Sequence, residues 1–192
     1  MRPRLNNSCQ RLQRFHPVRC MGGMKSITTL LLLLAAVAVG ATKERPIATV
    51  HVFLKENCPI AIYHTKTLSE LHERFAMEIA FRGYVSTSKA TEQSVAAFKA
   101  KFVIPFAIEP DASLSKAHHF GAKVTPEVVV LDRDGKTLYR GHIDNTYADF
   151  GKRRRVTTSH DLRDVLEALA KGEAVEPKST EAVGCLIPAA KS

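Results

Sequence analysis

Residues 50–62 read VHVFLKENCPIAI and decide the fold of the chain. An apolar run gives way at residues 55–57 to a polar turn and then to Cys58-Pro59, after which a long helical pattern begins. Proline is favoured at the first position of a helix, because its missing N–H would have no helical partner there. Pro59 therefore predicts that Cys58 is the cap residue of a helix. The dipole and free N–H groups of a helix start favour thiolate over thiol at such a cysteine.

Residues 1–41 are predicted to be a secretory signal peptide. Residues 1–26 are basic and contain no acid, residues 27–39 form the apolar run ITTLLLLLAAVAV, and Val39-Gly40-Ala41 offers small residues for cleavage. The run is shorter than the ~20 apolar residues that a membrane-spanning helix needs. We therefore expect an exported, periplasmic or extracellular protein with no stable membrane insertion after cleavage. A retained membrane anchor is the alternative, and Met21 and Met24 are alternative starts.

Removal of this leader changes the charge and the cysteine count. Of 28 Lys and Arg, six lie in residues 1–41, so 22 remain against 19 acids and the net charge falls from +9 to +3. The argument for a nucleic-acid partner disappears with those charges. Cleavage of the leader also removes Cys9 and Cys20. Cys58 and Cys185 then remain as a pair in an exported protein, where disulfides persist. We expect one domain over residues 42–172 and a C-terminal tail, 173–192, that carries Cys185.

The order of predicted elements indicates an α/β fold. Helical spacing of Leu68, Leu71, Phe75 and Ile79 predicts a helix over residues 60–82, which Gly83 ends. The other expected helices start near residue 91, span 113–120, and run from a capping box at 158 to Gly172. Expected strands span residues 47–54, 84–86, 105–108, 128–131 and 136–142, the last two joined by a tight turn. This order predicts a central mixed β-sheet flanked by helices on both faces.

Four short motifs resemble those of a known protein family: Asn57-Cys58-Pro59-Ile60, Thr125-Pro126-Glu127-Val128, 139–144 (YRGHID) and Gly184-Cys185-Leu186-Ile187. In this order they resemble thioredoxin-fold redoxin-domain proteins, more narrowly exported bacterial proteins related to the alkyl hydroperoxide reductase group. The resemblance covers residues 47–188. It implies a thioredoxin-like fold in which Pro126 is cis, faces Cys58 and borders the groove where a partner's disulfide docks.

The chain departs from this family in two respects. Thioredoxins have a second cysteine three residues after the first, where this chain has Ala61. Peroxidatic peroxiredoxins have a Thr or Ser three residues before the cysteine and a Pro seven before it, where this chain has Lys55 and His51. The first departure removes the local resolving thiol, and the second removes a hydroxyl that helps to hold a peroxide.

The resulting hypothesis is a thiol–disulfide oxidoreductase. Cys58 is the expected attacking thiolate and Cys185 the resolving thiol, both catalytic, while Thr125, Pro126 and Pro59 shape the substrate groove. No cofactor is required, because the sulfurs carry the redox chemistry. The expected partners are protein thiols or disulfides and a redox partner protein.

Two alternatives remain open from the sequence. One is a non-catalytic binding module stapled by a Cys58–Cys185 disulfide, which would close a 127-residue loop and contribute about 5 kcal/mol in the chain-entropy model. Its groove would hold a partner protein or a metal, with Cys58 and His64 as candidate ligands for copper or zinc. The other is a thiol peroxidase. Asp144 is expected to cap a turn through its carboxylate, and residues 152–155 to form a solvated basic loop.

Overall fold

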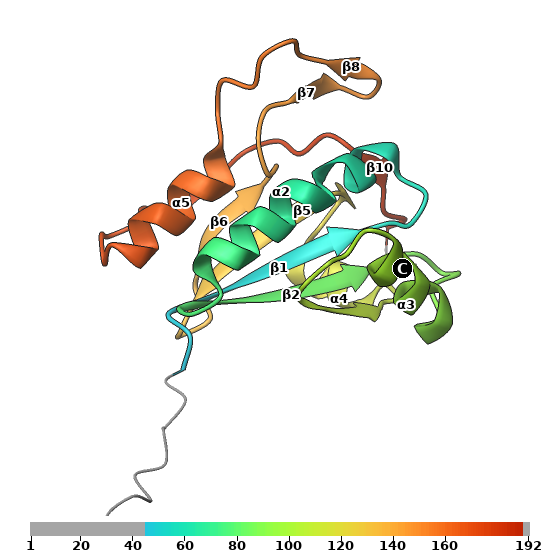
Figure 1. Ribbon diagram of the computed structural model, residues 1–192, viewed down its shortest axis with the longest axis horizontal. Coiled ribbons are helices and arrows are strands. Elements are labelled where there is room, and N and C mark those ends of the chain that lie inside the picture. The colour runs from blue at the N-terminus through green and yellow to red at the C-terminus, as the bar shows by residue number, and fades with distance from the viewer. Residues whose placement is uncertain (1–44, 190–192) are drawn as a thin grey trace, which may run out of the picture. The chain divides into compact units, whose positions relative to one another are not determined.

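The core of the protein is a six-stranded mixed sheet with the strand order β3-β2-β1-β5-β6-β9 (Figure 1). The computed structural model describes residues 45–189. Strands β1, β2 and β3 are mutually parallel, β5 is antiparallel to both β1 and β6, and β9 is parallel to β6. The strand bounds are β1 Ala48–Leu54, β2 Ile79–Val85, β3 Ala107–Pro110, β5 Glu127–Asp132, β6 Thr137–Gly141 and β9 Lys178–Ser179.

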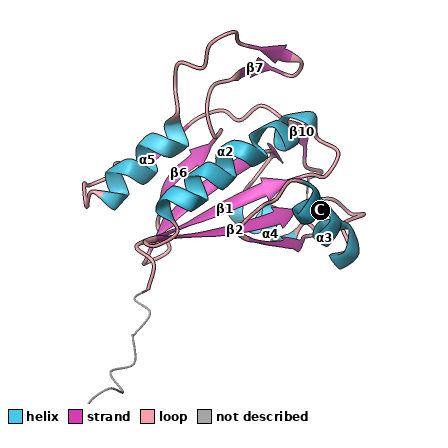
Figure 2. Cartoon of the chain, in the orientation of Figure 1, coloured by secondary structure: helices cyan, strands magenta, loops and turns pink. Residues whose placement is uncertain are grey.

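Helices cover both faces of this sheet (Figure 2). They are α2 Pro59–Phe75, α3 Glu92–Lys101, α4 Ser115–Phe120 and α5 Asp161–Ala170. Side chains of β1 alternate between the faces, as the two-residue period of a strand requires. Val50, Val52 and Leu54 join the larger apolar cluster with residues of α2, α3 and α5, whereas Phe53 joins a second cluster with Ala117 of α4. The predicted mixed sheet between helical layers is confirmed.

The first helix is shorter than the sequence predicts. It ends at Phe75, and residues 79–82, expected to be helical, belong to β2. The whole of β2 pairs in parallel with β1, from Ala48 opposite Ile79 to Leu54 opposite Val85. This pairing overrides the helical spacing, because Ile79 is buried equally well from a strand.

Gly83 does not end a helix, as the sequence suggested, but lies inside β2, where β3 approaches closely. A Cβ atom at this position would lie 2.3 Å from Cγ2 of Ile108, the β3 residue paired with it. Glycine is therefore required by contact between neighbouring strands rather than by chain termination.

We predict that Gly83→Val lowers the free energy of unfolding by about 1–3 kcal/mol, because the added methyl groups overpack the contact with Ile108. Urea unfolding measures the change. Ala80→Val in the same strand is the matched control, since Ala80 is only half-buried, and should stay within about 0.5 kcal/mol of the parent. Equal losses for both variants would contradict the close approach.

Smaller differences concern element ends. The strand expected over residues 105–108 is β3, Ala107–Pro110. The basic segment 152–155, expected to be a loop, begins with β8 (Lys152–Arg153), which pairs with β7 (Tyr147–Asp149) in a small hairpin. The last helix begins after a cap at His160 instead of Thr158. The Thr158 hydroxyl instead accepts a hydrogen bond from Asn145 Nδ2, so it serves the loop and not the helix. The tight turn before β6 is as predicted, with Gly135 at φ +82°.

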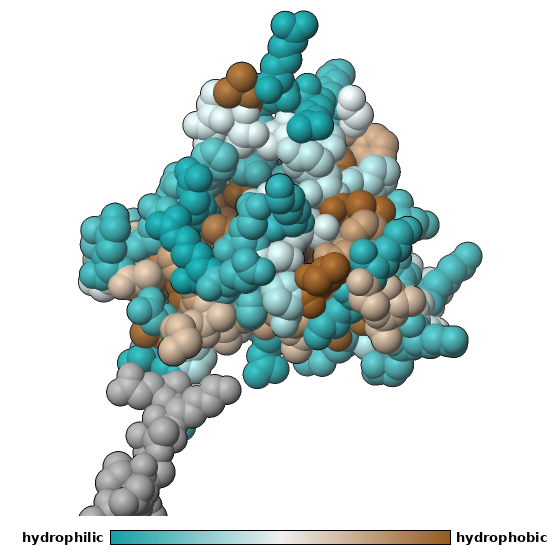
Figure 3. All heavy atoms as spheres, in the orientation of Figure 1, coloured by the Kyte–Doolittle hydropathy of each residue, from teal (hydrophilic) through white to brown (hydrophobic). Residues whose placement is uncertain are grey.

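Residues beyond the last helix return to the sheet. Lys178–Ser179 adds β9 to its edge, and β10 (Cys185–Leu186) pairs with β4 (Val124–Thr125). Met77, Val103 and Phe150 are exposed large apolar side chains, and the face in Figure 3 is mainly hydrophilic. Within residues 45–189 no helix has the length and apolar character needed to cross a bilayer. The predicted signal peptide, with Cys9 and Cys20, lies outside the described residues.

Candidate functional site

Cys58 lies between the end of β1 and the start of α2. It is the N-cap residue of α2, with extended backbone angles of φ −87° and ψ 114°, and Pro59 follows it at the helix start, as predicted. The Cys58 N–H donates to the Lys55 carbonyl oxygen at 3.1 Å, and the Cys58 carbonyl accepts the first helical N–H, from Ile62, at 2.9 Å. The turn and the helix together fix the sulfur at the positive end of the helix dipole.

A cis peptide bond lies beside this sulfur. The Thr125-Pro126 bond is cis, which confirms what the family resemblance implied. The Cys58 Sγ lies 3.0 Å from the carbonyl oxygen of Thr125. Residues far apart in the sequence thus meet at one point, between the start of α2 and the loop before β5.

A buried carboxylate, which the sequence analysis missed, holds this loop. Oε2 of Glu127 accepts the backbone N–H groups of Lys123 at 2.7 Å and Val124 at 3.2 Å. Glu127 is buried, so these hydrogen bonds offset the cost of placing its carboxyl group there. The only available signal was the glutamate directly after Thr125-Pro126, at the mouth of an otherwise apolar strand.

The C-terminal segment brings the second cysteine to the same place. Cys185 pairs with Thr125 in the antiparallel β10–β4 ladder, and the Thr125 hydroxyl lies 3.4 Å from the Cys185 carbonyl oxygen. The Cys185 side chain lowers the pKa of Cys58 and Cys58 raises that of Cys185, so the two thiols act on each other. Both cysteines are free thiols in this structure. Cys58, Thr125 and Cys185 are therefore brought together, with Pro59 and Pro126 next to them in the chain.

Cys58 is not accessible to solvent in this structure. Its exposed fraction is 0%. The C-terminal segment lies directly against the Thr125-Pro126 loop, because a Cβ atom at Gly184 would lie 2.1 Å from the Thr125 carbonyl oxygen. The C-terminal segment thus lies next to the loop that contacts the sulfur, and Cys58 itself belongs to the larger apolar cluster, against which Cys185 packs.

The two thiols have opposite acid–base character. Burial opposes ionisation of Cys58, but hydrogen bonds from the Cys185 side chain and from the backbone of Ala61 and Cys185 outweigh it, so the pKa of Cys58 lies below its ordinary value. Burial, together with the hydrogen bond to Cys58 and the Cys58 charge, raises the pKa of Cys185 to about 11. The pair therefore combines a Cys58 thiol that ionises more readily than usual with a Cys185 thiol that ionises less readily.

The other residues singled out in the sequence lie elsewhere. His51 points to the opposite face of the sheet, where its Nδ1 lies 3.0 Å from the Tyr84 hydroxyl and its ring stacks on Phe120. Burial, with the charges of Arg82, Lys116 and His119, lowers the pKa of His51 to about 4. His51 is therefore a neutral member of the second apolar layer near neutral pH.

His64 is buried and faces Asp144. Its Nδ1 lies 3.7 Å from Asp144 Oδ2, and burial lowers the pKa of His64 although the carboxylate opposes this. Asp144 Oδ1 accepts the Thr146 N–H at 2.9 Å, so the predicted turn cap is confirmed. Residues 45–189 contain no group of three or more His, Cys, Asp or Glu side chains placed to hold a metal ion.

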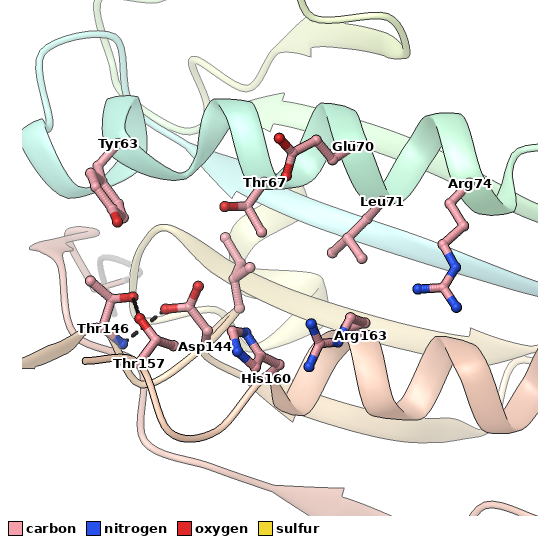
Figure 4. A pocket seen from close by; sticks show the side chains of 11 residues that line it. Tyr63, Thr67, Glu70, Leu71, Arg74, Asp144, Thr146, Thr157, His160 and Arg163 are labelled. Atoms are coloured by element: carbon pink, nitrogen blue, oxygen red, sulfur yellow. Dashed lines mark hydrogen bonds between the residues drawn. The ribbon is translucent and has the colours of Figure 1, made fainter.

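A separate polar pocket of about 380 Å³ lies between α2, α5 and the loop after β6. Asp144 and Thr146 lie toward the Tyr63 end of this pocket, and Arg74 and Arg163 toward the other (Figure 4). Its lining does not include either cysteine, so it is distinct from the thiol site.

Comparison with known proteins supports the fold. No family model matches the chain, and no curated protein matches it. A hypothetical protein from Sinorhizobium meliloti is 25% identical in an alignment that covers 73% of this chain and 79% of that protein, with a TM-score of 0.65. For an uncharacterized conserved protein from Geobacillus kaustophilus the identity is 24%, the coverage 76% and 79%, and the TM-score 0.66.

A more distant solved structure is a secreted Mycobacterium tuberculosis disulfide oxidoreductase, which is 19% identical over 63% of this chain and 81% of that one, with a TM-score of 0.47. The fold is assigned on the molecule itself. The strand order, the cysteine-capped helix after β1 and the cis-proline before β5 together define a thioredoxin-like fold, as the resemblance implied.

We predict that Cys185→Ala raises the pKa of Cys58, because it removes the side-chain hydrogen bond that stabilises the thiolate. Cys185→Ser keeps a hydroxyl donor and should leave the pKa of Cys58 closer to its value in the parent. Thiolate absorbance against pH, in the full chain with Cys9→Ser and Cys20→Ser, measures both. The same Cys58 pKa in the alanine and serine variants would contradict a role for this hydrogen bond.

Proposed function

We propose that the protein is an exported thioredoxin-like thiol–disulfide oxidoreductase in which Cys58 attacks and Cys185 resolves. The observation that carries this proposal is the meeting of the two thiols at the cis Thr125-Pro126 loop, one ionised more readily than usual and the other less. The basic leader followed by a short apolar run supports export. The substrates are protein thiols or disulfides.

The reaction balances within the two sulfurs and the partner. The Cys58 thiolate attacks one sulfur of a partner disulfide, which forms a mixed disulfide and releases the other partner sulfur as a thiolate. Cys185 then loses its proton and attacks the Cys58 sulfur, which forms the Cys58–Cys185 disulfide and releases the second partner thiolate. The partner is reduced by two electrons and the cysteine pair is oxidised. A second protein, with two thiols, then reduces the Cys58–Cys185 disulfide and is itself oxidised.

The pKa difference gives the two steps an order. Burial raises the pKa of Cys185, and while Cys58 is a thiolate its hydrogen bond and charge raise that pKa further, so the resolving thiol stays protonated. Formation of the mixed disulfide removes that charge. The pKa of Cys185 then falls, and its thiolate becomes available for the second attack.

A second candidate is the non-catalytic module with a permanent Cys58–Cys185 disulfide. The complete burial of Cys58 favours it, because a sulfur without solvent contact cannot react with an external disulfide until the residues around it move. The two candidates differ in the reduction potential of the bond, since structural disulfides typically lie below about −300 mV.

We expect the oxidised protein to contain one Cys58–Cys185 disulfide with a potential above about −300 mV, and the reduced protein to reduce insulin. Cys58→Ser should abolish insulin reduction, because no other described thiol lies at the helix start. Cys185→Ser should accumulate mixed disulfides, because the resolving thiol is missing. Titration against glutathione and dithiothreitol buffers measures the potential, with the Cys9→Ser/Cys20→Ser chain as the parent.

A potential below about −300 mV together with no insulin reduction would contradict the oxidoreductase and support the stapled module. Two free thiols under oxidising, denaturing conditions would contradict both.

A further inference from the structure

An open hollow of about 590 Å³ lies on the other face of the sheet from the thiol site, where α4 meets β1 and β2. His51 of β1 is paired with Arg82 of β2, and Tyr84 follows two residues after Arg82, so all three side chains lie on one face. Helix α4 adds Lys116, His119 and Phe120 to the lining. Three aromatic rings and three basic side chains therefore meet in one hollow that contains neither cysteine.

The rings of this hollow are packed against one another. His51 stacks on Phe120 with the ring centroids 4.1 Å apart, and on Tyr84 with the centroids 5.8 Å apart. His51 is 8% exposed and Tyr84 4% exposed, so the chain holds both rings in place. Phe120 is half-buried. Aromatic rings attract one another beyond the area that they bury, so this surface favours a flat ring in a ligand.

The charged side chains around the rings are all basic. Arg82, Lys116 and His119 are exposed, and within residues 45–189 no carboxylate forms an ion pair with any of them. Their charges meet at the buried His51 ring. Burial, followed by these three charges, lowers the pKa of His51 to about 4. The hollow therefore has a positive potential, which attracts anions.

Two carboxylates lie near this hollow but do not line it. Burial raises the pKa of Tyr84, the charges of Glu109 and Asp111 add to the increase, and Arg82 opposes it. The Asp111 carboxylate already accepts hydrogen bonds from the Ser86 hydroxyl and from two N–H groups of α4. These acids therefore keep Tyr84 protonated, and they leave the basic side chains of the hollow without a counter-ion of their own.

His51 offers a hydrogen-bond donor to a ligand. Its ring is neutral near neutral pH and carries one N–H group. Nδ1 lies 3.0 Å from the protonated Tyr84 hydroxyl. When that hydroxyl donates to Nδ1, the ring proton is on Nε2, for which residues 45–189 supply no acceptor. An anion in the hollow supplies the missing acceptor and selects this tautomer.

We propose that this hollow binds a small ligand in which a flat aromatic ring carries an anionic group. The ring packs on Phe120 and His51, and the anionic group meets Arg82 and Lys116. Hydrogen bonds from a charged donor to an anion are the strong ones, so the two cations supply most of the affinity. Aromatic carboxylates and nucleoside phosphates share this chemistry. The inference does not depend on the proposed function, because the hollow lies apart from both cysteines.

A set of probes separates the ring from the charge. Isothermal titration calorimetry at low ionic strength measures binding to the full chain of 2-naphthoate, uncharged 2-naphthamide, non-aromatic cyclohexanecarboxylate and acetate. We expect 2-naphthoate to bind about tenfold more tightly than each of the others, because only it has both parts. Equal affinity for naphthamide, or for cyclohexanecarboxylate, would overturn the proposal. Adenosine monophosphate identifies the source: tighter binding than 2-naphthoate favours nucleoside phosphates, and weaker binding favours aromatic carboxylates.

The basic side chains are tested by neutral substitutions. Arg82→Gln and Lys116→Gln should each weaken 2-naphthoate binding about tenfold. Lys101→Gln is the matched control: the Lys101 Nζ lies 5.3 Å from the Phe102 ring centroid, as the Lys116 Nζ lies 6.0 Å from that of Tyr84, but Lys101 is outside the hollow. All three variants lose one positive charge. Equal affinities in the three would overturn the proposal, because the attraction would then be non-specific.

The His51 ring reports whether the ligand lies in this hollow. A bound anion should raise the pKa of His51 by about one pH unit, because a negative charge beside the ring favours its protonated form. NMR titration of the His51 ring signals, assigned with His51→Gln, measures the pKa with and without saturating 2-naphthoate. An unchanged pKa would overturn the proposal, since any heat measured by calorimetry would then come from binding elsewhere in the chain.

Discussion

The contact between Cys58 Sγ and the Thr125 carbonyl oxygen, 3.0 Å long, is the constraint on which the thiol site depends. It joins the start of α2 to the loop before β5, and each side is fixed by its own local chemistry. On one side Pro59 sets the helix start. On the other the Glu127 carboxylate gathers the N–H groups that lead into the cis bond. Because both supports lie at the ends of central strands, the sheet itself sets the position of the sulfur.

The same carbonyl group connects the site to the C-terminus. Thr125 is the partner of Cys185 in the β10–β4 ladder, and its carbonyl oxygen excludes any side chain at position 184. Thr125 therefore contacts the Cys58 sulfur, pairs with Cys185 and leaves room only for glycine at position 184. Burial opposes ionisation of both thiols, and their interaction with each other lowers the pKa of Cys58 and raises that of Cys185.

Sequence reasoning was reliable where a local rule decided the structure. The Cys58-Pro59 step identified the helix start, and the glycine in the turn before β6 identified the hairpin. It failed where a distant partner decided the structure. Ile79 fits a helical stripe, yet pairing with β1 makes it part of a strand. The cis geometry of Pro126 came only from the family resemblance, because no local pattern distinguishes a cis from a trans proline.

Local sequence rules could not predict the position of the C-terminal segment that contains β10, for a further reason. A two-residue strand such as β10 has no periodicity to detect, and its only sequence mark is Gly184 before Cys185. The burial of Cys58 was consequently not predicted, because part of its surroundings comes from the far end of the chain. The role of Glu127 was missed because a glutamate beside an apolar strand more often faces solvent.

Burial of the attacking sulfur has a consequence for selectivity. When only a fraction of molecules has β10 displaced, the apparent affinity for every disulfide falls by that fraction. For a small disulfide the apparent affinity falls by this whole fraction, because the small disulfide makes no contact with the vacated edge of β4. A strand that pairs with β4 regains the hydrogen bonds that β10 gave up and so offsets the loss. In the proposed reaction, burial of Cys58 would therefore favour extended polypeptide partners over small disulfides.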